Sequence, residues 1–107
     1  MTAGGPLSPD LARLMAAVAD RPNVTLGQAM QNLGLMTGGK LFAFLNKGSL
    51  VLKLPTDVID GLIDSHGAVR FDRGQGKPLR EWVVVPPSAV ADWPGLTRRA
   101  CDFVAGL

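Results

Sequence analysis

The positive charge of this chain is concentrated in one short stretch. The 107 residues contain 11 Lys and Arg against 9 Asp and Glu, a net charge of only +2, so the overall charge is weak evidence for a nucleic-acid partner. Within residues 69–80, however, a single acidic residue stands among four basic ones: Arg70, Arg73, Lys77 and Arg80. These side chains are the first candidates for contact with phosphate groups.

A second set of basic candidates lies further upstream. It consists of Lys40, Lys47 and Lys53. The run Gly74-Gln75-Gly76-Lys77 would let backbone amides approach an anion. It lacks the full Walker spacing and the following Ser or Thr, so a surface turn is favoured, with contact to a nucleic-acid backbone as its alternative role. Trp82 and Trp93 are interpreted as core or interface aromatics, with base stacking as a minor alternative.

Residues that could support catalysis or metal binding are few. His66 is the only histidine and Cys101 the only cysteine, which excludes an internal disulfide and a zinc site built from several such ligands. His66 is expected at a helix end and Cys101 in the core. Asp57, Asp60 and Asp64 have the spacing of an ordinary solvated helix face. We therefore expect no enzymatic activity, no metal and no cofactor.

Length and composition indicate one globular domain spanning residues 1–107. Hydrophobic residues make up 47% and charged residues 19%, which is typical of a soluble folded protein. No stretch approaches the ~20 apolar residues that a membrane span requires, and the first residues do not resemble a signal peptide. We expect a cytoplasmic protein without a membrane partner, with residues 1–7 disordered.

The segment from Lys40 to Pro55 predicts a β-hairpin. Two β-type runs flank the loop Asn46-Lys47-Gly48, which ends in glycine. If Leu45 lies opposite Ser49, one side holds the pairs Phe44–Leu50 and Phe42–Leu52, and the other holds Leu41–Lys53 and Ala43–Val51. The first side is wholly apolar, so other elements must cover it.

Helices are expected before and after this hairpin. Ser8 is an N-cap for a helix that starts at Pro9 and is stopped by Pro22. Thr56 is expected to cap a second helix that closes at His66-Gly67. Its inward side is formed by Val58, Ile59, Leu62 and Ile63. Strands are expected over 69–71 and 81–85. A final helical segment begins at Ser88 or Asp92, is divided by Pro94, and runs to about Ala105 with Leu96, Ala100, Phe103 and Val104 inward.

The segment before the hairpin has two interpretations. Thr25 and Gln28 resemble a capping box, and the apolar spacing indicates a short helix from Leu26 to Leu33. Alternatively, residues 35–37 form a strand that turns at Gly38-Gly39 into the Lys40 strand.

Several motifs together resemble the TfoX/Sxy N-terminal domain and the related MmcQ/YjbR-like proteins. They are Gly34-Leu35, Gly38-Gly39-Lys40-Leu41-Phe42-Ala43, Lys53-Leu54-Pro55, Val58, Leu62, Phe71-Asp72, Gly74, Gly76 and Glu81-Trp82-Val83-Val84-Val85-Pro86. The resemblance covers about Val24 to Val104. The chain departs from it at Ala29-Met30-Gln31, where the family usually has Met-Phe-Gly. The resemblance favours the extended form near Leu35.

The resemblance implies an α+β fold: a curved antiparallel sheet built around the central hairpin and flanked by N-terminal, middle and C-terminal helices. It also implies DNA binding, because relatives regulate natural competence together with a transcription regulator. Those relatives carry a second domain, similar to a helix-hairpin-helix module, that these 107 residues do not include.

Two functions follow as expectations. The first is a non-enzymatic regulatory protein that binds DNA through the basic loop. The alternative is a protein interaction module without nucleic-acid binding, in which a sheet edge or the last helix mediates homodimer formation or docking to a transcription regulator.

Overall fold

The protein is an α+β domain with three α-helices and a six-stranded antiparallel sheet in the part of the chain that can be described. The computed structural model describes residues 8–29, 32–72 and 76–107, so the expected disorder of residues 1–7 falls outside them. The elements are α1 (Pro9–Ala17), β1 (Val24–Ala29), β2 (Asn32–Thr37), β3 (Lys40–Asn46), β4 (Ser49–Lys53), α2 (Thr56–His66), β5 (Val69–Arg70), β6 (Trp82–Val85), the short 3-10 helix η1 (Pro87–Asp92) and α3 (Trp93–Ala105). The expected fold class is confirmed.

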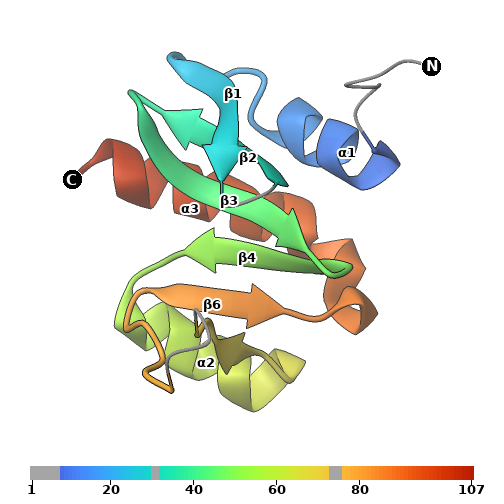
Figure 1. The fold of residues 1–107 in the computed structure, drawn as a ribbon, viewed down its shortest axis with the longest axis vertical. Helices are drawn as coiled ribbons and strands as arrows, with labels where there is room; N and C mark the ends of the chain where they lie inside the picture. Colours follow the sequence, from blue (N-terminus) through green and yellow to red (C-terminus); the bar gives the residue numbers. More distant parts are fainter. Residues whose placement is uncertain (1–7, 30–31, 73–75) are drawn as a thin grey trace.

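The strands lie side by side in the order β1-β2-β3-β4-β6-β5, and every neighbouring pair is antiparallel. In Figure 1, α3 passes behind the sheet and α2 lies beside β6. Helix α3 contacts β2, β3 and β4, and α1 packs against α3. One face of the sheet is therefore covered by helices.

The central hairpin has a two-residue turn, not the three-residue loop expected from the sequence. Asn46 pairs with Ser49, and Phe44 lies opposite Val51 instead of Leu50. The turn residues Lys47 and Gly48 have φ of 53° and 82°, the left-handed geometry that matches the twist of the two strands. Because this geometry keeps Asn46 in the ladder, the predicted register was wrong by one residue.

A β-bulge changes which phenylalanine faces the helices. Leu35 pairs with Ala43 and Met36 with Leu41, so Phe42 is the extra residue on β3. Phe42 and Ala43 both join the core beneath the helices, whereas Phe44 lies on the opposite face. The prediction that Phe42 and Phe44 share one face was wrong, because it assumed unbroken alternation along the strand.

The segment before the hairpin is extended, so the extended interpretation is confirmed and the helical alternative from Leu26 to Leu33 is wrong. Strands β1 and β2 pair with Leu26 opposite Leu35 and Gly27 opposite Gly34. Met30 and Gln31, between these strands, lie outside the described residues. Glycines lower helix propensity, and here Gly27 makes room for a neighbour, since a Cβ atom on it would overlap the Met36 side chain. The predicted turn at Gly38-Gly39 is confirmed, with φ of 57° and 83°.

The helix boundaries follow their caps. The Leu11 N–H donates to Ser8 Oγ at 3.1 Å, as predicted. Thr56 is the first residue of α2 and makes no side-chain cap bond, so its predicted capping role was wrong; Pro55 occupies the N-cap position. Gly67 ends α2 with φ of 67°. In the last segment η1 passes into α3 at Trp93, and Pro94 lies in the first turn of α3.

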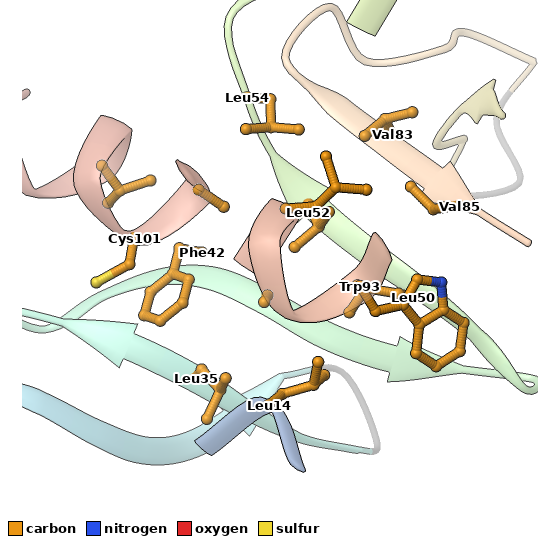
Figure 2. Close-up of a cluster of buried hydrophobic side chains, with 14 of the residues drawn as sticks. Leu14, Leu35, Phe42, Leu50, Leu52, Leu54, Val83, Val85, Trp93 and Cys101 are labelled. Atoms are coloured by element: carbon orange, nitrogen blue, oxygen red, sulfur yellow. The ribbon is translucent and has the colours of Figure 1, made fainter. Parts of the chain in front are cut away.

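The main core lies between the sheet and the helices. Figure 2 shows side chains from β2, β3, β4 and β6 meeting those of α1 and α3, with Trp93 at one end and Cys101 at the other. Trp93 is 2% exposed, and its indole N–H donates to the Pro86 carbonyl oxygen at 3.3 Å.

A smaller group, which we name the Phe44 cluster, lies on the opposite face of the sheet. Its buried members are Phe44, Val51 and Phe71, with Leu41, Leu79, Trp82 and Val84 packed around them.

Candidate nucleic-acid interface

Two of the six predicted basic residues that the structure describes line the same concavity. Lys53 ends β4 and Arg80 lies just before β6. Together with Thr56, Leu79, Glu81 and Trp82 they line a hollow of about 580 Å³ at one end of the sheet. We call it the Lys53–Arg80 concavity.

Backbone pairing holds the two cations at this place. Lys53 lies opposite Trp82 in the β4–β6 ladder, and the Leu54 N–H donates to the Glu81 carbonyl oxygen at 3.0 Å. The loop that precedes β6 is tied back as well, because the Leu79 N–H donates to the Phe71 carbonyl oxygen at 2.8 Å. Arg80 therefore stands between two anchored positions and not on a free loop.

Trp82 forms an aromatic wall of the concavity. It is only partly buried, and its ring lies 6.1 Å from that of Phe44 at an angle of 52°. Phe44 in turn meets Phe71 edge to face at 5.7 Å. This aromatic packing fixes the indole of Trp82 while leaving part of its surface accessible, an arrangement on which a nucleic-acid base can stack.

The charges around the concavity favour binding of an anion, although one carboxylate in the lining opposes it. Neither Lys53 nor Arg80 forms an ion pair with any described residue. Helix α2 begins at Thr56, so its positive end adds partial charge. Glu81 contributes a carboxylate to the same lining. The two cations are therefore free to bind a ligand, and Glu81 weakens the attraction.

The other predicted basic residues are dispersed. Arg70 is occupied by Asp60 of α2, with Nη2 to Oδ1 at 2.7 Å. Lys40 lines a separate small hollow beside Val104, at the end of α3. Lys47 occupies the β3–β4 turn, at the opposite end of the hairpin from Lys53. Lys77 is exposed in the loop before Arg80.

The remaining predicted residue, Arg73, lies outside the described residues, as do Gly74 and Gln75 of the predicted glycine loop. In the described part of that loop, Gly76 has φ of 72°. A left-handed glycine is typical of a surface turn.

Sequence reasoning did not assign Thr56 or Glu81 to this lining, and it gave base stacking by Trp82 only as a minor alternative. The Glu-Trp-Val-Val-Val strand contained a signal for two of them. A strand that alternates between two faces presents Trp82 and Val84 on the side opposite Val83 and Val85. The partner strand, however, could not be deduced from local pattern.

His66 connects two elements at the far end of α2. Its Nε2 lies 2.9 Å from Asp92 Oδ2, and its Nδ1 lies 2.5 Å from Ser65 Oγ. The Ser65 hydroxyl donates to the Gly61 carbonyl oxygen at 2.7 Å. These contacts connect the end of α2 to η1.

Cys101 is 1% exposed, and burial raises the pKa of its thiol; its predicted place in the core is confirmed. The described residues contain no group of three or more His, Cys, Asp or Glu side chains arranged to hold a metal ion. Among the helices described, none combines the length and apolar character needed to cross a membrane.

Comparisons of the chain with protein-family models, with curated proteins and with solved structures found no match.

Proposed function

We propose that the protein is a non-enzymatic regulatory domain of the TfoX N-terminal type that binds nucleic acid through the Lys53–Arg80 concavity. The observation that carries this proposal is the pairing of two cations, unengaged among the described residues, with a partly exposed indole in one hollow. Cations beside an accessible aromatic ring suit a phosphate backbone whose bases stack without sequence readout. The sequence resemblance supports the same function.

The dispersed placement of the other cations sharpens the proposal. Arg70 is neutralised by Asp60, and Lys40 and Lys47 lie away from the concavity. The contact is therefore proposed for Lys53 and Arg80, with Lys77 as an outer contact from the loop that leads to them. So few phosphate contacts give weak binding at physiological salt.

The test is a titration of labelled mixed-sequence DNA, both duplex and single-stranded, against the double variant Lys53→Glu/Arg80→Glu. Each lost phosphate contact should reduce the slope of log affinity against log salt by about 1. We expect binding at ~50 mM salt by the unchanged protein and at least a roughly tenfold loss in the double variant, since each reversed charge acts on a phosphate at close range.

The matched control is Lys40→Glu/Lys47→Glu, which changes the net charge by the same amount elsewhere on the hairpin. We expect a small loss that does not alter the salt slope. Equal losses in the two double variants, or no binding by the unchanged protein at ~50 mM salt, contradict the proposal.

Glu81→Gln tests the sign of the ligand's charge. Removing a carboxylate beside a bound phosphate relieves a repulsion of about 1 kcal/mol at 4 Å in water, so DNA affinity should rise by up to about fivefold. The fluorescence of Trp82 reports DNA binding, because Trp93 is buried. Quenching of this fluorescence by DNA should disappear in Trp82→Phe. A fall in DNA affinity on Glu81→Gln contradicts an anionic ligand at this place.

A further inference from the structure

The two edges of the sheet are built differently. At one edge, β5 has only two residues and ends in Arg70, which is paired with Asp60. At the other, β1 presents six residues, Val24–Ala29, with neither a charge nor a proline among them. No described strand pairs with the outer side of β1. Proteins ordinarily protect a sheet edge by shortness, charge, proline or a bulge, so β5 is protected and β1 is open.

The outward backbone groups of β1 can be assigned from one hydrogen bond. The Gly38 N–H donates to the Asn23 carbonyl oxygen at 3.2 Å, which makes these two residues a hydrogen-bonded pair at the start of the β1–β2 ladder. Such pairs alternate along an antiparallel ladder. Thr25 and Gly27 therefore bond to β2. The residues whose N–H and C=O groups point away from the sheet are Val24, Leu26 and Gln28.

We propose that β1 pairs with β1 of a second copy of this chain, antiparallel and across a two-fold axis at Leu26. This register places Leu26 opposite its own counterpart and Val24 opposite Gln28 of the other copy. All the outward groups of the described strand are then paired, and each opposed pair exchanges two N–H···O bonds. A two-fold axis at Gly27 would pair fewer of them. The two sheets become one continuous sheet with the helices of both copies on the same side.

The side chains of this edge suit a second copy. Leu26 is 38% exposed and Leu33, on the neighbouring strand, is 40% exposed. Leu26 pairs with Leu35, which is buried in the main core, so Leu26 lies on the helix-covered face. Leu33, which pairs with Gln28, is two residues from Leu35 on β2 and therefore lies on the same face. Across the axis each Leu26 contacts its counterpart. A charge at the two-fold axis would face its own counterpart, and β1 has no charged residue there.

The first experiment measures mass by light scattering or sedimentation over a wide range of protein concentration. We expect the unchanged protein to reach twice the chain mass of 11.3 kDa and Leu26→Lys to stay monomeric, because two ammonium groups then face each other at the axis. Val69→Lys is the matched control. It places the same group on the opposite edge, where Val69 is 59% exposed, and it should leave the dimer intact.

A second variant covers the case in which Leu26→Lys fails to fold. Opposed residues of a hydrogen-bonded antiparallel pair have Cα atoms about 5.5 Å apart, within the range of about 4.4–6.8 Å that a disulfide spans. Leu26→Cys should therefore cross-link two copies under mild oxidation, whereas Val69→Cys should not. Cys101 is 1% exposed and serves as an internal control.

Three results would overturn the proposal. They are an unchanged protein that is monomeric at every concentration, a dimer that folded Leu26→Lys leaves intact, and a dimer in which Leu26→Cys does not cross-link. None of these results depends on DNA, so the proposed nucleic-acid function can fail while the dimer stands, and the reverse.

Discussion

The two faces of the sheet differ in how much apolar material they bury. Among the described residues, the main core beneath the helices contains 19 buried residues, contributed by the sheet, all three helices and the segments that connect them. The Phe44 cluster on the other face contains three among the same described residues. Since apolar burial is the dominant favourable term in folding, stability resides chiefly beneath the helices. The thinner face can carry an accessible aromatic such as Trp82 without endangering the fold.

The largest expected effect is in the main core. Leu52 is fully buried on the central strand β4 and faces the helices. Leu52→Ala should lower the free energy of unfolding by about 2–5 kcal/mol, because it removes buried methyl groups and leaves a cavity that the packed layer cannot close. Urea denaturation followed by circular dichroism measures the change. A loss under about 1 kcal/mol would contradict the assignment of stability to this face.

A matched pair of valines compares the two faces directly. Val83 and Val51 are both fully buried, but Val83 faces the helices and Val51 belongs to the Phe44 cluster. We expect Val83→Ala to cost about 2 kcal/mol and Val51→Ala about 1 kcal/mol. The difference arises because the small cluster, bordered by the loop that carries Leu79, closes around a void more easily. Equal losses in parallel urea titrations would remove the distinction between the faces.

The smallest effect concerns the rim of the helical layer. Arg21 binds Asp102 of α3 through two hydrogen bonds of 3.0 and 3.1 Å and also binds Asp20 at 2.8 Å. The hydrogen bond and charge of Arg21 lower the pKa of Asp20 below its ordinary 3.8. A lowered folded-state pKa gives stability that is present above pH 3.8 and is lost as the pH falls through the lowered value.

Arg21→Ala should therefore lower the melting temperature slightly at neutral pH and flatten its decline in acid. Melting curves from neutral pH down to below pH 3.8 measure both effects. Lys53→Ala is the control, because Lys53 forms no ion pair with the described residues. If Arg21→Ala leaves the decline of the melting temperature in acid unchanged, the contacts of Arg21 contribute no pH-dependent stability.

Local sequence signals were enough to predict most of the elements. Ser8, Gly67 and the pair Gly38-Gly39 have chemistry that acts within a few residues, and their predicted positions hold. Register was harder, because Asn46 suits either a turn or a strand, and the twist of the paired strands decides between them. The bulge at Phe42 could not be predicted from the local sequence either, because it depends on how β3 pairs with β2.

The candidate site could be predicted only in part. Lys53 and Arg80 were selected for their charge, but pairing between β4 and β6 is what brings them together. The same local charge excess pointed to Arg70, whose contact with Asp60 of α2 depends on tertiary packing. The helical alternative for Leu26 to Leu33 failed for the same reason, because its apolar spacing suits a helix until β2 supplies a neighbouring strand.

The contact between Arg21 and Asp102 joins positions 81 residues apart in the chain. Closing a loop of this length in an unfolded chain costs entropy, and intervening structure that brings the ends together removes most of that cost. The sheet and α3 supply that structure, so we expect this contact to form after them. Interactions absent from the transition state act on the unfolding rate and hardly on the folding rate. The small stabilisation that the Arg21–Asp102 contact supplies should therefore appear as slower unfolding, with the folding rate hardly changed.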